Sequence, residues 1–337
     1  MHQIHQKHGV KLLTPSSLDE AVQEYASRPR AGIMAGGTDL MVLIKDRLAT
    51  PEHLISLSGI EGLRRIRRTA ERWEIGALAG LWELERNREL GRDFPALAQA
   101  LNTMAAPPLR NAGTIGGNIC LDLKCIYYNQ SHRWQRSLAD CLKAGGRVCH
   151  VAPAGKRCWG ALAADTVGPL VVSGARVKLV SQYGQRTVPL EAFFSGDGLA
   201  PHDLRPGEIL TQIHLALPKP DTGQAYQRFA LRRAIDFSLL NLSASVTVDP
   251  AGKVVFLELI LGAAGPRLVR LGESLAGLVG TDLNADILAR TTAGLGREAV
   301  RISRSPRLTR HLQEVAGVLG SRVLTEAYRR AGGGSHA

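Results

Sequence analysis

All five cysteines of this 337-residue chain lie between positions 120 and 158. Four of them, Cys125, Cys141, Cys149 and Cys158, are separated by 15, 7 and 8 residues. Thiolates bind zinc and iron–sulfur clusters, but these gaps match neither zinc ribbons nor bacterial ferredoxins. An odd number of clustered cysteines favours metal ligation over a disulfide framework. The residues alone therefore predict a metal site and leave zinc and iron–sulfur equally open.

Two glycine-rich motifs could bind an anionic group. The first is AGIMAGGTDL, residues 31–40, and the second is LRNAGTIGGNIC, residues 109–120. Glycines after a strand let the backbone turn its N–H groups toward a phosphate, and Thr38 could add a hydroxyl donor. Neither motif is a GxGxxG fingerprint or a Walker loop, and each alone also fits an ordinary tight turn. Together they resemble the two halves of a dinucleotide site.

The bulk composition is that of a globular protein with room for more than one core, at 45% apolar and 21% charged residues. The formal charge is +12, mostly from arginine, which suits an acidic partner. Aromatic residues make up only 5%, and the basic residues are scattered apart from residues 63–68, so we expect no nucleic-acid partner. We expect no membrane segment and, from the polar start MHQIHQKHGV, no signal peptide, hence a cytoplasmic protein with reduced thiols.

Hydrophobic periodicity and turn residues predict an α+β fold in two parts. Ser17 and Glu20 have capping-box spacing at the start of a helix. The expected elements before the cysteines are a helix (16–28), a strand–helix–strand unit (31–34, 40–48, 53–57), a hairpin (64–77) and helices interrupted at Pro95 (81–105). After them we expect strands (170–190) turning at Tyr183–Gly184, a boundary (217–224), a strand pair (243–264) and two helices (283–295, 309–331).

The paired motifs AGGTDL and RNAGTIGGN resemble the FAD-binding subunit or domain of the xanthine dehydrogenase family of molybdenum hydroxylases. GEILTQIHLALP (207–218) and AYQRFALRRAIDFSLLNLSASV (225–246) extend the resemblance over most of residues 10–330. The resemblance implies an FAD-binding domain of the vanillyl-alcohol-oxidase type in two parts and a C-terminal domain of the CO-dehydrogenase flavoprotein type. The implied limits are 1–220 for the first domain (with 1–57 as its small βαβ part), 122–162 for an inserted loop, 221–331 for the second domain and 332–337 for a flexible tail.

The same resemblance implies which residues bind FAD. The first motif would wrap the pyrophosphate through Gly32, Ile33, Met34, Ala35, Gly36, Gly37, Thr38 and Asp39. The second would complete the cradle through Thr114, Ile115, Gly116, Gly117 and Asn118. Asp165 matches an aspartate on the ribose–adenine side, Leu210 an apolar contact and Met104 a position near the flavin. Arg228 stands where many relatives carry lysine, so a cation persists with different geometry.

The segment that follows the second motif is longer than in most family members, which reach the aspartate at 165 through a short connection. Its sequence resembles the insertion of the 4-hydroxybenzoyl-CoA reductase branch, which carries a [4Fe–4S] cluster in addition to FAD. The implied ligands are Cys125, Cys141, Cys149 and Cys158, and Cys120 is interpreted as a packed small residue. Lys143, Arg147, Lys156 and Arg157 flank the thiols and would offset the negative charge of the cluster.

The chain shows no nucleophile–base set, metalloprotease motif or carboxylate pair, so we expect no catalytic residue on it. The resemblance implies an electron-transfer subunit with a molybdopterin-containing large subunit, a small subunit with two [2Fe–2S] clusters and ferredoxin as donor, assembled as a dimer of heterotrimers. The implied reaction is reductive dehydroxylation of 4-hydroxybenzoyl-CoA to benzoyl-CoA. Two alternatives stay open: an FAD subunit of an oxidising hydroxylase acting on xanthine, CO or an aromatic heterocycle, and a zinc-stabilised flavin-binding module.

Overall fold

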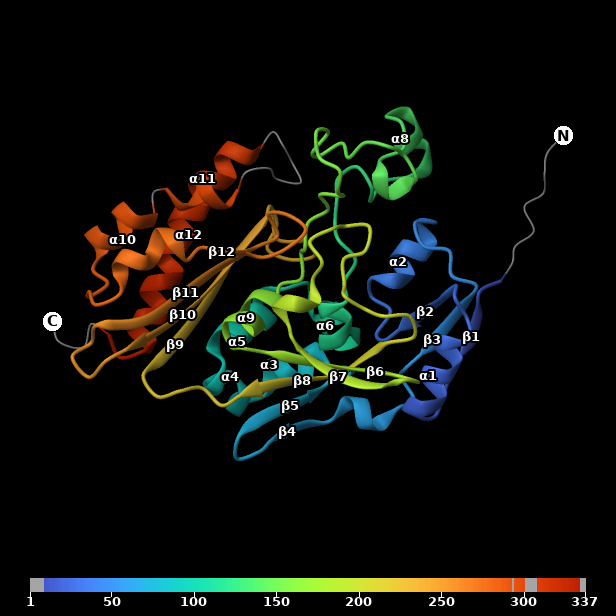
Figure 1. Ribbon diagram of the computed structural model, residues 1–337, viewed down its shortest axis with the longest axis horizontal. Helices are drawn as coiled ribbons and strands as arrows, with labels where there is room; N and C mark the ends of the chain where they lie inside the picture. The colour runs from blue at the N-terminus through green and yellow to red at the C-terminus, as the bar shows by residue number, and fades with distance from the viewer. Residues whose placement is uncertain (1–8, 293, 301–307, 334–337) are drawn as a thin grey trace.

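The computed structural model describes residues 9–292, 294–300 and 308–333, and these residues form three β-sheets with helices between and around them (Figure 1). The sheets have the strand orders β1-β3-β2, β4-β5-β8-β6-β7 and β12-β11-β10-β9. Short 3-10 helices lie at η1 (Glu61–Arg64), η2 (Leu142–Ala144), η3 (Glu191–Phe193) and η4 (Glu273–Leu278). The mixed α+β fold agrees with the prediction.

The N-terminal sheet is parallel and carries the first glycine motif at its edge. Its strands are β1 (Lys11–Leu13), β2 (Ala31–Met34) and β3 (His53–Ser56), connected through α1 (Leu18–Ala26) and α2 (Leu40–Lys45). The predicted strand–helix–strand unit is confirmed, and β1 was not predicted. The hydroxyl of Ser17 accepts from the N–H of Glu20 at 3.2 Å, while the Glu20 carboxylate accepts from Ser16 instead of closing the capping box.

The five-stranded sheet is antiparallel and supports the middle of the molecule. Its strands are β4 (Ile66–Arg68), β5 (Arg72–Gly76), β6 (Arg176–Ser181), β7 (Gly184–Pro189) and β8 (Ile209–Ala216). Alternate residues such as Trp73, Val177 and Ile213 are buried against α3 (Leu81–Arg86), α4 (Arg88–Asp93) and α5 (Pro95–Thr103). Pro95 opens α5 as its first residue, so the predicted interruption marks a helix start.

Two segments differ from the sequence-based expectation. Residues at the start of the expected strand region instead form α9 (Val167–Val172), a helix with every residue buried. A short apolar run without polar alternation cannot be assigned to strand or helix by its pattern, which is why this expectation was wrong. The second glycine motif, for which the sequence also allowed a tight turn, is folded into α6 (Pro107–Ala112) and α7 (Ile115–Ile119).

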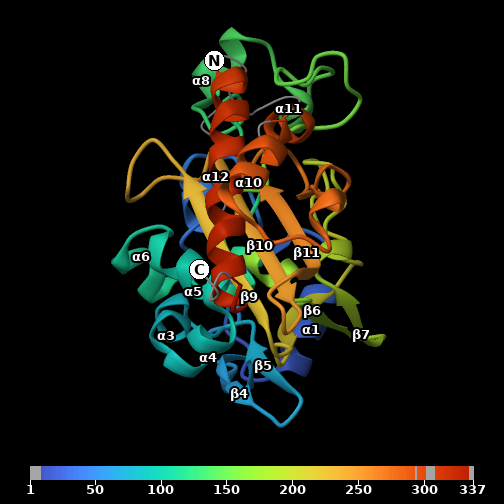
Figure 2. The ribbon, with the colours of Figure 1, turned by 90° about the vertical axis from the view of Figure 1, so that its left-hand side faces the viewer.

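The C-terminal sheet packs against one long helix. Its strands are β9 (Thr222–Phe229), β10 (Leu240–Val248), β11 (Val254–Gly262) and β12 (Val269–Arg270), and α12 (Thr309–Arg330) lies along one face (Figure 2). The strand pair and its turn at Asp249 are confirmed. The helix expected at 283–295 is α10 (Ala285–Thr292) followed by α11 (Leu295–Ala299). Residues 334–337 of the expected tail lie outside the described residues.

The inserted cysteine loop projects beyond the sheets with α8 (His132–Ser137) at its tip (Figure 1). Its neck is closed by a pair of backbone hydrogen bonds between Lys124 and Ala161, at 2.9 and 2.8 Å. The loop is also attached to the rest of the molecule where the Tyr128 hydroxyl donates to the carbonyl of Leu48 at 3.0 Å. Across the described ranges, no helix combines the length and apolar character needed to cross a membrane.

Candidate functional site

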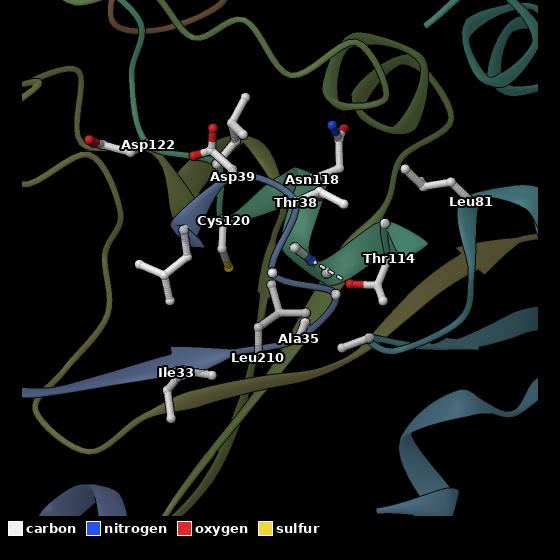
Figure 3. Close-up of a pocket in the computed structure, with 18 of the residues that line it drawn as sticks. Ile33, Ala35, Thr38, Asp39, Leu81, Thr114, Asn118, Cys120, Asp122 and Leu210 are labelled. Carbon is white, nitrogen blue, oxygen red and sulfur yellow. Dashed lines mark hydrogen bonds between the residues drawn. The ribbon is translucent and has the colours of Figure 1, made fainter. Parts of the chain in front are cut away.

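A cavity of about 380 Å³ lies where the N-terminal sheet, the α6–α7 region and the loop after β9 meet (Figure 3). This volume is in the range of small-molecule pockets. The predicted FAD-binding residues that line it are Ile33, Ala35, Gly36, Gly37, Thr38, Asp39, Met104, Thr114, Gly116, Gly117, Asn118, Asp165 and Leu210. The predicted residues outside the lining are Gly32, Met34, Ile115 and Arg228.

The first glycine motif exposes its backbone donors to the cavity. A Cβ at Gly36 would lie 1.8 Å from the carbonyl oxygen of Ala112, and Gly37 has φ +70°, so both positions require glycine. Within the described chain, no acceptor pairs with the backbone N–H of Gly36, Gly37, Thr38 or Asp39. Consecutive free N–H groups at the edge of a cavity form a concave site for an anion. The motif therefore offers the cavity four backbone donors that are unpaired among the described residues.

The second motif has a different role from the one expected. Its backbone N–H groups already have hydrogen-bond acceptors within the protein. Ile115 donates to the carbonyl of Ala79 at 3.0 Å, Gly116 to that of Ala77 at 2.9 Å and Gly117 to the hydroxyl of Thr114 at 3.1 Å. A Cβ at Gly116 would lie 2.7 Å from Ala77, so this glycine permits close packing on the strand end. The expectation of free phosphate donors here is corrected, because these N–H groups donate to the backbone at Ala77 and Ala79 and to the Thr114 hydroxyl. The segment forms a rigid wall of the cavity instead.

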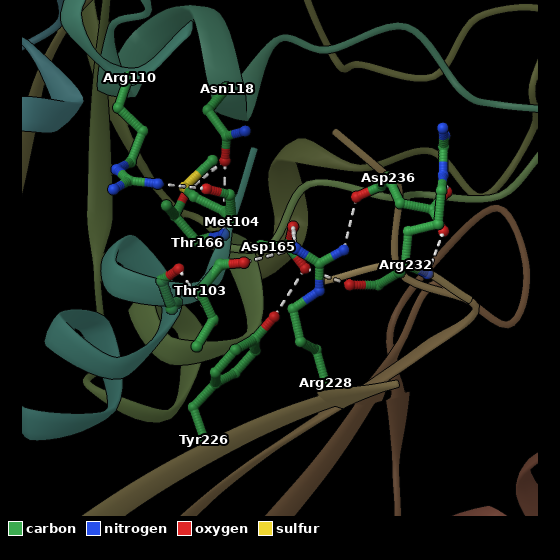
Figure 4. Close-up of polar contacts among 12 residues, drawn as sticks. Thr103, Met104, Arg110, Asn118, Asp165, Thr166, Tyr226, Arg228, Arg232 and Asp236 are labelled. Carbon is green, nitrogen blue, oxygen red and sulfur yellow. Dashed lines mark hydrogen bonds and ion pairs between the residues drawn. The ribbon is translucent and has the colours of Figure 1, made fainter. Parts of the chain in front are cut away.

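Asp165 connects the cavity wall to the C-terminal sheet (Figure 4). Its carboxylate accepts from the hydroxyl of Tyr226 at 2.6 Å and from Ser238, and it lies 3.5 Å from the guanidinium of Arg228. Burial raises the pKa of Tyr226 well above its usual value, which keeps the hydroxyl protonated as a donor. Arg228 also donates to the carbonyl of Thr103 at 2.9 Å. Arg228 thus lies outside the cavity lining and contacts Asp165, which is part of that lining.

Sequence reasoning missed a strained pair at the rim of the cavity. Ala105 and Ile235 both have φ +52°, and the N–H of Ile235 donates to the carbonyl of Ala105 at 3.2 Å. Both line the cavity, and Ile235 is 62% exposed. A left-handed β-branched residue costs on the order of 1–3 kcal/mol and is concentrated at functional sites. Nothing in the sequence indicates such a backbone conformation at alanine or isoleucine.

Cys120 was interpreted as a packed bystander, but its sulfur points into the cavity (Figure 3). Although the residue is partly exposed, removal of the thiol from water raises the pKa of Cys120 to about 12. The thiol is therefore protonated near neutral pH and behaves as a small apolar wall group. The one sequence feature that could have indicated a place in the cavity wall is the position of Cys120 at the end of the second glycine motif.

The structure gathers the four predicted metal ligands in the inserted loop, all buried and as free thiols. Cys125, Cys141 and Cys149 pack in one cluster with Tyr128. The N–H of Tyr127 donates to the sulfur of Cys125, and the N–H of Trp159 to that of Cys149, both at 3.4 Å. Over the described part of the chain, no three His, Cys, Asp or Glu side chains converge closely enough to hold a single metal ion.

The fourth thiol, Cys158, lies at the end of the loop. Gly198 leaves room for it, because a Cβ there would be 2.6 Å from the sulfur. Burial raises the pKa of Cys158 to about 11, opposed by the N–H of Gly160 and by the charge of Lys143. Burial also raises the pKa of Cys125. Ligation by these thiols requires deprotonation, which a bound cation would drive.

Two ion pairs connect the cysteine loop to the cavity. Lys124, which precedes Cys125, pairs with Asp39 of the first glycine motif. Asp122, which lines the cavity, pairs with Lys143, two residues after Cys141. Sequence reasoning placed the two sites next to each other in the chain but did not indicate this pairing.

The comparisons with known proteins agree with this geometry. The family described as "FAD binding domain in molybdopterin dehydrogenase" matches residues 8–219. The chain belongs to this family. It is therefore an FAD-binding oxidoreductase subunit of the molybdenum hydroxylase type, as the glycine motifs had indicated.

Two curated relatives span nearly the whole chain. The xanthine dehydrogenase FAD-binding subunit of Escherichia coli O157:H7 is 26% identical over 325 residues, covering 94% of this chain and 96% of the relative. The carbon monoxide dehydrogenase medium chain of Afipia carboxidovorans is 28% identical over 298 residues, covering 88% and 89%. Similarity over almost full length to two different dehydrogenases supports the family and leaves the substrate open.

Solved structures confirm the fold. Reconstituted CO dehydrogenase from Oligotropha carboxidovorans has a chain that matches with a TM-score of 0.77 at 25% identity, covering 96% of this chain and 98% of that chain. Quinoline 2-oxidoreductase from Pseudomonas putida 86 matches with a TM-score of 0.76 at 22% identity over 96% and 98%. The arrangement of the three sheets is thus that of the family.

Proposed function

We propose that this chain is an electron-transfer subunit of a molybdenum enzyme of the 4-hydroxybenzoyl-CoA reductase type, with FAD in the cavity and a [4Fe–4S] cluster on the cysteine loop. When bound, these groups carry electrons between a ferredoxin donor and the partner subunits. The single observation that carries the proposal is the set of four buried thiols in a loop tied by ion pairs to the cavity. In this proposal residues 1–220 form the FAD-binding domain and 221–331 the C-terminal domain.

The cavity fits FAD by the chemistry of its walls. The free N–H groups of residues 36–39 and the hydroxyl of Thr38 would hold the pyrophosphate. Thr114, Asn118 and Asp165 would offer polar atoms to the ribose and adenine side, and Leu210 and Met104 would supply apolar contacts. Gly36 permits close approach of the first motif to Ala112, and Gly116 permits close packing of α7 on Ala77. These residues bind and orient the cofactor and exclude water from it.

The cysteine loop supplies four buried thiols, the ligand set of an iron–sulfur cluster. Four thiolates also suit a structural zinc ion, and the family resemblance of the insertion favours the cluster. Iron–sulfur clusters are larger, and the backbone N–H groups of Tyr127 and Trp159 already donate to two of the sulfurs. Cys125, Cys141, Cys149 and Cys158 would be the ligands. The charge of Lys143 beside Cys158 favours the thiolate form.

The outer surface of the cysteine loop suits an acidic electron donor. Five cations on it are exposed and have no ion-pair partner among the described residues: Arg133, Arg136, Arg147, Lys156 and Arg157. Exposed apolar side chains lie among them in the sequence: Ile126, Trp134, Leu138 and Val148. Apolar contacts surrounded by charge of one sign are a common design for transient docking of a partner of opposite charge. An acidic ferredoxin has this chemistry.

Substrate chemistry is assigned to partner chains in this proposal. They are a molybdopterin-containing large subunit and a small subunit with two [2Fe–2S] clusters, assembled as a dimer of heterotrimers. The names of the relatives support an assembly, because they include a medium chain and FAD-binding subunits. Three carboxylates of this chain that line the cavity, those of Asp39, Asp122 and Asp165, are held in ion pairs or hydrogen bonds.

The proposed reaction is tested with the purified, anaerobic complex that contains this chain. Reduced ferredoxin and 4-hydroxybenzoyl-CoA should yield benzoyl-CoA, detected by chromatography, and omission of ferredoxin should abolish the product. Xanthine, nicotinate and quinoline with an oxidising dye serve as the contrasting substrates. Turnover of one of these without formation of benzoyl-CoA would replace the reductive function with that of an oxidising hydroxylase.

A further inference from the structure

We infer that Lys124, at the neck of the cysteine loop, sets the affinity of the cavity for FAD by neutralising Asp39. The inference rests on FAD occupying the cavity, as proposed above. Asp39 is the last of the four residues, 36–39, whose backbone N–H groups are free. Its side chain lines the cavity. Its carboxylate pairs with the ammonium group of Lys124, whose side chain is only 8% exposed.

The Asp39 carboxylate must be neutralised because the diphosphate of FAD is also negatively charged. A diphosphate is an anion, and a carboxylate beside its binding site opposes it at short range in a partly buried setting. Asp39 is 25% exposed, so water screens it only in part. Its side chain makes no capping hydrogen bond to α2, which leaves the ion pair with Lys124 as the contact that holds its charge. With Lys124 present, the motif is close to neutral and its N–H groups can act on the anion.

Lys124 reaches Asp39 because of how the cysteine loop closes. Its N–H and carbonyl are both bonded to Ala161 across the neck, which fixes the start of its side chain. Its ammonium group lies 5.2 Å from the ring centre of Phe237, a residue that lines the cavity rim. The next residue is the proposed ligand Cys125. A residue fixed by the closed loop therefore controls charge in the flavin site, and it is a positioning residue, not a catalytic one.

The test is a titration of the full chain, in its purified complex after removal of flavin, with FAD followed by fluorescence. Lys124→Met should raise the Kd for FAD on the order of 10- to 100-fold, because it leaves an uncompensated carboxylate beside the anion. Asp39→Asn should lower the Kd, because the cation then faces the diphosphate. The double variant should bind between the two. Lys219→Met is the matched control, since Lys219 is exposed and forms no ion pair with any described residue.

The two single variants distinguish neutralisation of Asp39 by Lys124 from simple attachment of the cysteine loop to the glycine motif. If the pair only fastened the loop to the motif, both variants would break it and weaken FAD binding alike, and that result would overturn the inference. Should Lys124→Met fail to fold, the Asp39→Asn variant still decides, because weaker binding by that variant contradicts the electrostatic role. A wild-type chain that does not bind FAD at all would contradict the proposed function itself.

Discussion

Gly36 and Gly116 show how single residues define the cavity. Each lies against the backbone of another segment, Gly36 against Ala112 and Gly116 against Ala77, at distances that no side chain could share. The first contact places the glycine motif against the end of α6, and the second packs α7 against the backbone that follows β5. Close approach of backbones therefore requires glycine at both positions.

Gly36→Ala should weaken FAD binding and destabilise the chain. The added methyl group would lie 1.8 Å from the Ala112 carbonyl oxygen, so the motif and the end of α6 must separate, which we expect to cost about 2 kcal/mol or more. Flavin titration and thermal unfolding measure both effects. Gly62→Ala is the control, because its Cβ would meet nothing within 4 Å. Equal behaviour of the two variants would show that the contact at Gly36 does not shape the site.

The thiols divide into two groups that one substitution can distinguish. Cys141→Ser should remove the visible absorption and iron of the proposed cluster while FAD content stays near wild type, because Cys141 lies in the cysteine loop. Cys120→Ser should keep the iron, because Cys120 lines the FAD cavity. Iron and flavin analysis of both variants provides the comparison. Loss of iron from the Cys120 variant would place that residue among the ligands.

At the scale of elements, the cysteine loop projects from the fold, and backbone hydrogen bonds join the two strands of chain at its base. The Lys124–Ala161 hydrogen bonds join its two ends, and among residues 122–162 the central core contains Leu123 and Leu162, which flank this pair. Asp122 and Lys124, which link it to the cavity, lie before the first proposed ligand. The loop thus adds a second site to a fold that can close without it.

Replacement of residues 125–160 by a short glycine–serine linker should therefore leave a folded, flavin-binding chain without iron. Because Lys124 is kept, we expect the Kd for FAD to rise by less than about tenfold. Flavin titration and circular dichroism of the shortened chain measure this outcome. A shortened chain that is insoluble or does not bind flavin would show that the loop is part of the core fold.

The sequence predicted most elements but not the way in which the second motif is used. Strands such as β2 and the β10–β11 pair follow from alternation and turn residues. The donors of α7 could not be assigned, because a glycine-rich string does not show whether its N–H groups meet a ligand or the strand end at Ala77. α9 was missed because a helix buried all round has no polar face. The left-handed Ala105 and Ile235 depend on contacts between distant segments.

At the scale of the whole molecule, three sheets meet around one cavity, and the cysteine loop projects from it (Figure 1). The two glycine motifs were expected to meet from the family resemblance, and the structure brings both to the cavity. The contribution of the C-terminal sheet through Tyr226 and Asp165 was not predicted in this form. Such contacts join segments far apart in the chain, and periodicity carries no information about them.

The net charge of +12 leads to a prediction for the whole assembly. Electron transfer from an acidic ferredoxin should slow when salt is raised from 50 to about 500 mM, because screening weakens steering between opposite charges. Reversal of charge at Arg133 and Arg136 should reduce the rate at low salt and flatten the salt dependence. Stopped-flow reduction measures both. A rate that does not change with ionic strength would contradict docking on this surface.

The central claim, that this chain joins FAD to a cluster held by four cysteines, is tested most directly by a cofactor inventory of the purified chain in its anaerobic complex. Iron, acid-labile sulfide, zinc and flavin are measured together, with the Cys141→Ser variant in parallel. The account predicts one FAD per chain and about four iron and four sulfide that the variant lacks. One zinc per chain, with no difference in iron between wild type and variant, would contradict it.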